Sequence, residues 1–514
     1  MIVVVLLVVV AVISLLAGAH WYVWRRLVRD TTTNRTARRT GAVVLTVLPL
    51  LSIAAMVSAR SGVPFWLERV LAWPGYLWLA LLLYLVLFLV AGEVVRAVWL
   101  RRVKRGERDG LPPGSGAGSA GAEVPSGASG DPSPGTPSPA ASPSSDASRA
   151  APARRETTTA LAMNTADTTD RPATSEAPLT ANGPAPARGS ATAGDAATAP
   201  APSLTPDAPG TQAETRTLSQ APSPAPGSAP ADAKSPAPAV SRRLFVSRVV
   251  GGGAAAAALA TVGYGTYGVL RGPRVKRVTV PLAKLPRAAH GFRIAVVSDI
   301  HLGPILGRAH TQRIVDTINS TRPDLVAVVG DMVDGDVADL GSAAVPLAQL
   351  EARQGAFFVT GNHEYFSGAE QWLDHVRELG LRPLENQRVE IPGGFDLAGV
   401  DDVEGESEGK GPDFEKALGD RDRARASVLL AHQPVVIHDA VKHGVDLQLS
   451  GHTHGGQLWP GNYLAELANP TVAGLERYGD TQLYVTRGAG AWGPPVRVGA
   501  ASDITVVQLA SRQA

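Results

Sequence analysis

Long apolar runs near the N-terminus constrain this chain more than any other feature of its sequence. Residues 2–18, 41–58 and 73–90 are almost entirely apolar. The first run ends in an aromatic cluster of His20, Trp21, Tyr22 and Trp24. About 20 apolar residues cross the hydrocarbon core of a bilayer, and aromatic side chains gather where a span leaves that core. The pattern therefore predicts three transmembrane helices within residues 1–100.

Basic residues between these runs predict their orientation. Several arginines follow the first run, and a cluster of Arg and Lys side chains follows the third. The loop between the second and third runs holds only Arg60 and Arg69, with Glu68 as a compensating acid. Because cytoplasmic loops carry the excess of positive charge, the N-terminus is expected outside and residue 101 onward in the cytoplasm.

The composition then changes for about 140 residues. From 101 to 240 the chain consists of repeated Pro-Ser, Pro-Ala and Gly-Ser pieces with scattered charges and no apolar periodicity. Such a segment cannot bury enough apolar surface to offset its conformational entropy. We predict a disordered linker that acts as a spacer.

A fourth apolar segment follows this linker. Residues 249–270 form a weakly apolar Gly/Ala-rich run, and the preceding pair Arg242-Arg243 resembles a twin-arginine export signal. An ordinary fourth span is the alternative, and either reading places the following residues outside the cytoplasm. Four basic residues from Arg271 to Arg277 oppose this placement, but long domains often cross despite such charges. We predict an uncleaved anchor at 241–271 in a multi-pass membrane protein with an extracytoplasmic C-terminal domain.

The segment 278–514 is predicted to be an α/β domain. Short apolar runs typical of buried strands alternate with helical patterns at 311–320 and 369–379. The five expected core strands are 294–298, 325–329, 357–360, 428–430 and 447–449. Three later runs lack intervening helices and are expected in a second sheet packed on the first. They are 396–399, 482–486 and 504–509.

Polar residues follow each of the five core strands directly. In chain order they are Asp299, His301, Asp331, Asn362, His363, His432, His452 and His454. In α/β sheets ligands bind outside the carboxyl ends of the strands, so these loops are expected to converge on one crevice. Any one of these motifs alone would be unremarkable as a turn, but five at strand ends predict a site.

The donor types predict a metal centre. The chain has no cysteine, and Asp, His and Asn ligands favour Mn, Fe or Zn in a mixed nitrogen and oxygen shell. Seven candidate ligands are too many for one catalytic ion, which keeps positions open for water and substrate. Two divalent ions would use them all, and a carboxylate has the two oxygens needed to bridge them. Asp331, alone at its strand end, is the expected bridge.

The order Asp-x-His, Gly-Asp, Gly-Asn-His-Glu, a lone His and Gly-His-x-His resembles the calcineurin-like metallophosphoesterase superfamily. The form Gly-His-Thr-His-Gly-Gly-Gln and the tail at 485–493 are similar to its membrane-associated bacterial branch, several members of which carry twin-arginine signals. The resemblance implies a four-layer α-β-β-α sandwich of two mixed sheets flanked by helices. It implies one ion bound by Asp299, His301, Asp331 and His454. It implies a second ion bound by Asp331, Asn362, His432 and His452.

The implied activity is hydrolysis of phosphomonoesters or phosphodiesters by a hydroxide held between the ions, with His363 as the acid near the leaving group. Glu364 or a backbone carbonyl is expected to fix the tautomer of His363. The substrate class includes lipid-linked and cell-wall-linked phosphoesters, and no feature indicates a nucleic-acid partner. Two alternatives stay open: a pyrophosphatase acting on a nucleotide-linked lipid, and a membrane scaffold without activity.

The remaining polar residues are expected to have ordinary roles. Asp334 and Asp336 are interpreted as helix-capping or loop residues, and a salt bridge in the second sheet is preferred to a phosphate contact for Arg487. Four further histidines lack a strand-end glycine context and are expected at the surface or behind the ligands. They are His310, His375, His438 and His443.

Overall fold

The computed structural model of the chain describes residues 2–109 and 242–513. Most of the predicted linker therefore lies outside the described residues. Within the described ranges, four helices are long and apolar enough to cross a membrane. They are α1 (Ile2–Trp24), α2 (Arg35–Ser58), α3 (Phe65–Asp109) and α4 (Arg242–Leu270). Helix α3 continues to Asp109, nine residues into the range predicted as linker.

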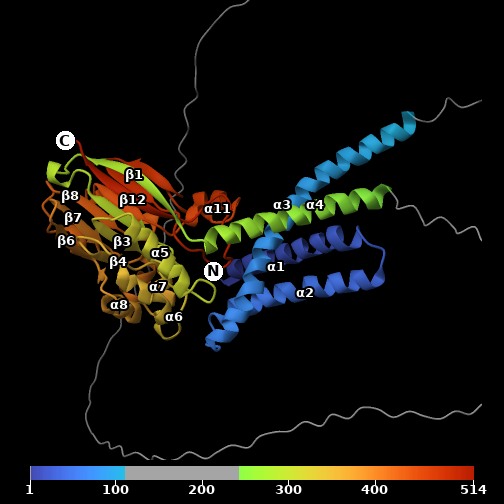
Figure 1. Cartoon of the computed structure of the whole chain (residues 1–514), viewed down its shortest axis with the longest axis horizontal. Helices are drawn as coiled ribbons and strands as arrows, with labels where there is room; N and C mark the ends of the chain where they lie inside the picture. The colour runs from blue at the N-terminus through green and yellow to red at the C-terminus, as the bar shows by residue number, and fades with distance from the viewer. Residues whose placement is uncertain (1, 110–241, 514) are drawn as a thin grey trace, which may run out of the picture. The chain divides into compact units, whose positions relative to one another are not determined.

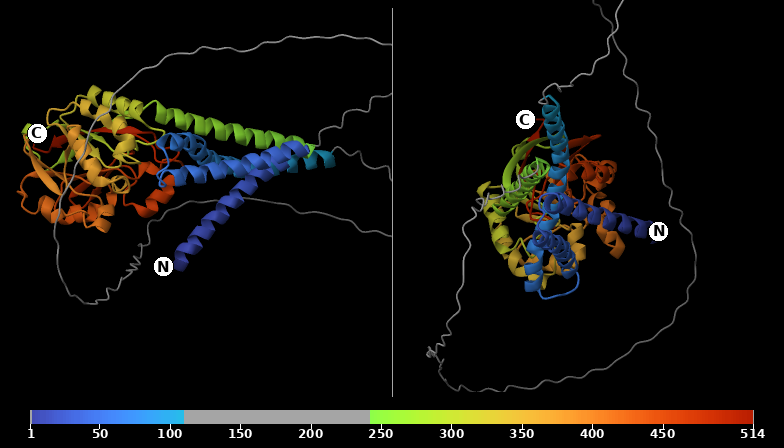
Figure 2. Two further views of the ribbon diagram at one scale, coloured as in Figure 1. Left: turned by 90° about the horizontal axis from the view of Figure 1, so that it is seen from below. Right: turned by 90° about the vertical axis from the view of Figure 1, so that its right-hand side faces the viewer.

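Helices α3 and α4 lie side by side (Figures 1 and 2). Trp78 and Leu85 of α3 pack with Ala258 of α4 in one apolar cluster. Helix α4 is rich in Gly and Ala, and small residues let neighbouring helices approach closely. Only three residues separate the end of α4 at Leu270 from the first strand, so the C-terminal domain starts directly at the end of the fourth helix.

The first sheet has six strands in the order β1-β12-β2-β3-β4-β5. Strands β2, β3, β4 and β5 are parallel neighbours, and β12 is antiparallel to β2 and parallel to β1. The bounds are β1 (Arg274–Leu282), β2 (Arg293–Val297), β3 (Leu325–Val329), β4 (Ala356–Val359), β5 (Arg382–Pro383) and β12 (Asp503–Ser511).

The second sheet also has six strands, in the order β10-β11-β9-β8-β7-β6. Its central strands are parallel, and each edge strand is antiparallel to its neighbour. The bounds are β6 (Gln387–Ile391), β7 (Phe395–Gly399), β8 (Ala426–Leu430), β9 (Leu447–Ser450), β10 (Gly474–Tyr478) and β11 (Thr481–Val485).

Two strand placements correct the sequence-based prediction. The run 504–509 was expected in the second sheet, but it forms β12, which lies inside the first sheet between β1 and β2. The runs 428–430 and 447–449 were grouped with the first sheet, but they form β8 and β9 in the second. Apolar content identifies a buried strand without identifying its neighbours, because pairing depends on contacts distant in sequence.

The two sheets pack face to face and helices cover their outer faces, which confirms the four-layer sandwich (Figure 1). Strand β3 shows why its sequence is apolar at every position. Leu325, Ala327 and Val329 face the core between the sheets, whereas Val326 and Val328 face the outer helices. The first sheet is covered by α5 (Arg308–Ser320), α6 (Val337–Ala344) and α8 (Ala369–Glu378). The second is covered by α9 (Phe414–Leu418) and α10 (Ile437–Lys442).

Candidate metal centre

The five polar motifs lie at the carboxyl ends of five parallel strands, two in the second sheet and three in the first. Asp299 follows β2, Asp331 follows β3, and Asn362 begins the short helix α7 (Asn362–Phe366) after β4. His432 follows β8, and His452 follows β9. The packing of the two sheets thus brings together loops that are up to about 150 residues apart in sequence.

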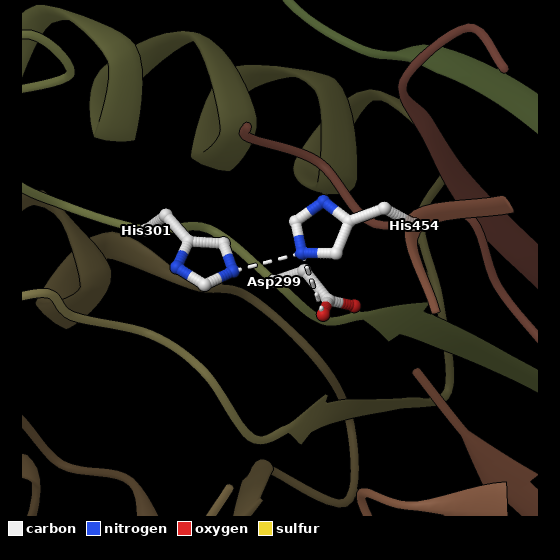
Figure 3. A group of neighbouring side chains, drawn as sticks. All are labelled: Asp299, His301 and His454. Atoms are coloured by element: carbon white, nitrogen blue, oxygen red, sulfur yellow. Dashed lines mark hydrogen bonds and ion pairs between the residues drawn. The ribbon is translucent and has the colours of Figure 1, made fainter. Parts of the chain in front are cut away.

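The first group of side chains consists of Asp299, His301 and His454 (Figure 3). The Nε2 atoms of His301 and His454 lie 2.9 Å apart, and His454 Nε2 lies 3.3 Å from Oδ1 of Asp299. All three side chains are buried. Two imidazole nitrogens and a carboxylate oxygen therefore converge on one point, as ligands of a cation do.

The second group consists of Asp331, His432 and His452, with Asn362 beside it. His432 Nε2 lies 3.1 Å from Asp331 Oδ2, and Asn362 Oδ1 lies 3.0 Å from His452 Nδ1. His432 Nδ1 donates a hydrogen bond to the Val329 carbonyl, which fixes the tautomer with a free lone pair on Nε2. A further group of His301, Asp331 and His363 connects the two sets.

Backbone conformation also distinguishes these residues. Five of the seven predicted ligands have φ between 48° and 71°, in the left-handed region that non-glycine residues rarely adopt. They are Asp299, His301, Asp331, His452 and His454. Strained backbone of this kind persists where the surrounding structure enforces it, and it is concentrated at functional sites. At Gly361 a Cβ atom would collide with Oδ1 of Asp331, so only glycine allows this approach.

Glu364 has a different role from the predicted one. Its carboxylate accepts hydrogen bonds from the backbone N–H groups of Asp331 at 2.9 Å, Met332 at 2.8 Å and Gly361 at 2.6 Å. Burial and the charge of Asp331 raise the pKa of Glu364 to about 7. Glu364 thus ties the β3 and β4 loops together, and the prediction that it orients His363 is wrong.

Asp334 takes that position instead. Its Oδ1 atom lies 2.7 Å from Nδ1 of His301 and 2.8 Å from Nδ1 of His363, so it orients both rings. Burial raises the pKa of this carboxyl, but the charges and hydrogen bonds of the two histidines outweigh burial and lower it to about 2. Asp334 does lie in a loop, as predicted, but the prediction gave it no role at the site. Asp336 does cap a helix, because it accepts a hydrogen bond from Asp339 at the start of α6.

Arg497 is a functional residue that the sequence analysis missed. It is buried, and its guanidinium donates to Nδ1 of His454 at 3.0 Å and to the His454 carbonyl at 3.1 Å. Burial lowers its pKa to about 10. Arg487, for which a salt bridge was expected, forms no ion pair among the described residues, and its side chain packs against Gly455.

The imidazole pKa values follow the carboxylates that each ring faces. Burial acts to lower the pKa of His301, His432, His452 and His454. For His301 the charge of Asp334 outweighs burial, and the pKa rises to about 9. Asp331 likewise raises the pKa of His432 well above its usual value. Burial and the charge of His432 lower the pKa of His452 to about 4. Burial, with the charges of His301 and Arg497, also lowers the pKa of His454, so His452 and His454 favour the neutral form that can bind a metal.

The other histidines are not members of the ligand groups, and one of them does not lie at the surface. His310 was expected at the surface or behind the ligands, yet it is buried on α5 and neither ring nitrogen has a hydrogen-bond partner among the described residues. Burial lowers its pKa to about 3. His375 packs against Trp372, and His443 stacks on Phe414.

Comparison with known proteins places this fold and site in one class. Residues 292–456 match the family model described as calcineurin-like phosphoesterase, which covers all of the predicted ligands. An uncharacterized metallophosphoesterase of Helicobacter pylori strain J99 is 38% identical over 257 residues, which are 49% of this chain and 68% of the relative. The chain belongs to the calcineurin-like metallophosphoesterase family.

A vertebrate relative shares the association with membrane helices. The transmembrane protein with metallophosphoesterase domain of Danio rerio is 40% identical over 259 residues, which are 48% of this chain and 59% of that protein. The chain thus spans less than two thirds of the length of this relative. Among solved structures, a dimetal phosphatase from Danio rerio matches 42% of this chain and 91% of its own, with 14% identity and a TM-score of 0.30.

Proposed function

We propose that this chain hydrolyses phosphoester bonds at a pair of divalent metal ions. The observation that carries the proposal is the pair of ligand groups described above. The ligand atoms of each group lie within 4.8 Å of one another, and Asp331 lies next to both groups. Asp299, His301, Asp331 and His454 would hold the first ion, and Asp331, Asn362, His432 and His452 the second. Asp331 would bridge the two.

The residues present fit such a pair of ions. Nε2 of His432 is buried and has no hydrogen-bond partner among the described residues, although it faces Asp331. The Nε2 atoms of His301 and His454 also lie only 2.9 Å apart. A cation satisfies each of these arrangements, and the mixed nitrogen and oxygen donors suit Mn, Fe or Zn. When bound, the two ions would activate a water molecule and neutralise charge on the phosphoryl oxygens.

The residues of the chain itself would position the substrate and move the proton. His363 lies beside the site, and its Nδ1–H is held by Asp334. This contact fixes the orientation of the ring and leaves Nε2 available to protonate the departing oxygen. Arg497 and Asp334 would keep the rings of His454 and His301 in place, as outer hydrogen-bond partners do in other metal sites.

Metal analysis of the purified full chain, paired with a phosphatase assay, tests this proposal. We expect about two bound ions per chain, loss of hydrolysis in excess chelator and recovery with Mn, Fe or Zn. Full activity after removal of all metal would contradict the proposal. A chain that binds metal but hydrolyses no phosphoester would favour the alternative of a membrane scaffold.

We also propose a domain organisation and an orientation. Residues 1–100 would hold three transmembrane helices, 101–240 a spacer, and 241–271 an uncleaved twin-arginine-like anchor before the catalytic domain at 278–514. The four apolar helices and the transmembrane relative support membrane anchoring. The charge distribution around the helices supports an extracytoplasmic catalytic domain.

A further inference from the structure

The most exposed large apolar side chains of the C-terminal domain fall in three short segments of the chain, at 366, 459–467 and 492. Among the described residues 271–513, every large apolar side chain that is at least 49% exposed belongs to this group, which we name the apolar rim. Its members are Phe366, Trp459, Tyr463, Leu464, Leu467 and Trp492. Large exposed apolar side chains mark an interaction site where they lie together on the surface.

Part of the apolar rim surrounds the proposed acid. The rings of Phe366 and Trp492 lie 5.6 Å and 5.8 Å from the ring of His363. Both side chains are more than half exposed. A leaving group that His363 protonates would therefore depart past apolar side chains.

The rest of the apolar rim is fixed to the same loop that carries His454. Gln457 donates to the Trp492 carbonyl at 2.9 Å and accepts from the Trp492 N–H at 3.0 Å. The chain then enters α11 (Gly461–Ala468), whose first turn is in close contact with Gly456. On this helix Leu464 is 72% exposed and Leu467 is 84% exposed, so among residues 2–109 and 242–513 these side chains lack an apolar partner.

The apolar rim continues into the surface of the membrane helices. Tyr84 of α3 donates a hydrogen bond to the Trp459 carbonyl at 2.9 Å, and Leu458 packs against the apolar cluster of α1, α3 and α4. The loop after Trp492 also reaches α3, because a Cβ atom at Gly493 would lie 3.9 Å from Tyr76. Exposed Tyr264 and Tyr267 near the end of α4 are typical of the aromatic belt at a membrane interface.

We propose that α11 and the apolar rim insert into the bilayer interface, and that the metal centre takes a phosphoester carried on a membrane lipid. The inference rests on the proposed phosphoesterase function and names its substrate class. The reaction is hydrolysis: an oxygen from water bonds to phosphorus, the bond from phosphorus to the lipid oxygen breaks, and that oxygen takes a proton. Continuity with the helices favours a bilayer over a soluble protein as the occupant of this surface.

Insertion can be measured directly, because the chain has no native cysteine. The full-length chain with Leu464→Cys, carrying an environment-sensitive fluorophore, is reconstituted into phosphatidylcholine–phosphatidylglycerol vesicles with or without brominated acyl chains. The control is Val441→Cys on α10, a partly exposed apolar site outside the apolar rim. We expect the brominated lipid to quench the label at 464 at least twofold and to leave the label at 441 unchanged. Equal signals at 464 in the two lipids would overturn the proposal.

Substrate choice is tested by a ratio of rates. The full-length Leu464→Glu/Leu467→Glu variant is assayed on a fluorescent phospholipid in vesicles and on a soluble nitrophenyl phosphoester. We expect the ratio of vesicle rate to soluble rate to fall at least tenfold, and Val441→Glu to leave the ratio unchanged. An unchanged ratio in the double variant would overturn the proposal.

Assays of the wild-type chain distinguish a failure of the lipid assignment from a failure of the proposed phosphoesterase function. Hydrolysis of the nitrophenyl ester without hydrolysis of any vesicle lipid would overturn the lipid assignment and leave the phosphoesterase function intact. Hydrolysis of neither ester by the metal-loaded chain would overturn the proposed function together with this inference.

Discussion

Asp331 is the residue on which both proposed metal sites depend. One of its oxygens lies 3.1 Å from His432 Nε2 and 3.8 Å from His301 Nε2, and the other accepts the backbone N–H of His363. Burial raises the pKa of this carboxyl, but the surrounding imidazoles outweigh burial and hold the pKa well below its usual range. The side chain therefore favours its anionic form, as a bridging ligand must.

Asp331→Asn tests this role, because it keeps the shape of the side chain and removes its charge. We expect the activity to fall by more than the roughly 10–100-fold typical of changes outside the ligand set, with loss of bound metal. Metal content by mass spectrometry and the rate on a nitrophenyl ester measure both effects. Asp336→Asn is the matched control, since Asp336 only caps α6 on the same loop. Near-normal activity in Asp331→Asn would exclude a bridging carboxylate.

His363→Ala separates chemistry from metal binding. We expect both ions to remain bound and the rate on alkyl phosphoesters to fall roughly 10²–10⁴-fold, the usual contribution of a positioned general acid. The loss should shrink for nitrophenyl esters, because a good leaving group needs little protonation. A series of esters with graded leaving groups, read beside metal content, measures this. Equal losses across the series, or a metal-poor variant, would show that His363 is a ligand or a structural residue.

The sequence could identify the candidate ligands, because they follow strands. It could not identify the side chains that orient those ligands. Asp299, Asp331 and His432 were predictable because each comes directly after a buried apolar run. Arg497 lies in a loop before β12 and reaches His454 only through the folded structure. Nothing in the local sequence of Arg497 marks this contact, and the same holds for the bridge that Asp334 makes between His301 and His363.

At the level of elements, periodicity located strands and helices but not their partners. The helical patterns at 311–320 and 369–379 are confirmed as α5 and α8. Strand β1 was not predicted, because its four basic and polar positions break the apolar pattern of a buried strand. It is the edge strand of the first sheet, where one side is solvated, so polar residues are tolerated there.

The acidic loop that carries Asp401 and Asp413 is held in place by hydrogen bonds to Asn386. Asn386 donates to Asp401 Oδ2 at 2.7 Å and accepts from the backbone N–H groups of Asp401 and Asp413. Burial, and next the charge of Glu385, raise the pKa of Asp401 to about 7. The loop is thus held in place through a carboxyl that favours its protonated form.

This shift predicts a pH dependence of stability. Between about pH 4, the ordinary pKa of Asp, and pH 7, the folded state holds the Asp401 proton and the unfolded state does not. The free energy of unfolding should therefore fall as the pH rises through this window. Asp401→Asn, which cannot titrate and can still accept from Asn386, should flatten the fall. Melting temperatures of the full chain in detergent at pH 5 and pH 8 measure it; Asp413→Asn is the control. Identical pH slopes in wild type and Asp401→Asn would contradict this.

At the scale of the whole molecule, α4 joins the C-terminal domain to the proposed membrane anchor. Only Arg271, Gly272 and Pro273 separate α4 from β1, so the domain starts within about 15 Å of the end of the helix. The backbone N–H of Arg497 lies 3.4 Å from the carbonyl of Gly265 in α4. A residue that contacts His454 is thus also in contact with the proposed fourth span. The side of the membrane on which α4 ends therefore decides where the proposed reaction takes place.

Reporter fusions test the proposed orientation. A reporter that is active only in the cytoplasm, fused at Gly130 and separately at Ala514, should give signal at Gly130 alone, because the basic clusters after α1 and α3 favour a cytoplasmic linker. Arg242→Lys/Arg243→Lys tests the route as well. This variant keeps the positive charge. If export uses the twin-arginine pathway, the C-terminal domain should nevertheless stay inside, with signal at Ala514. Export of the double lysine variant would instead indicate an ordinary fourth span. Signal at Ala514 in the wild-type chain would show that α4 does not carry the domain across, and the metal centre would then work in the cytoplasm.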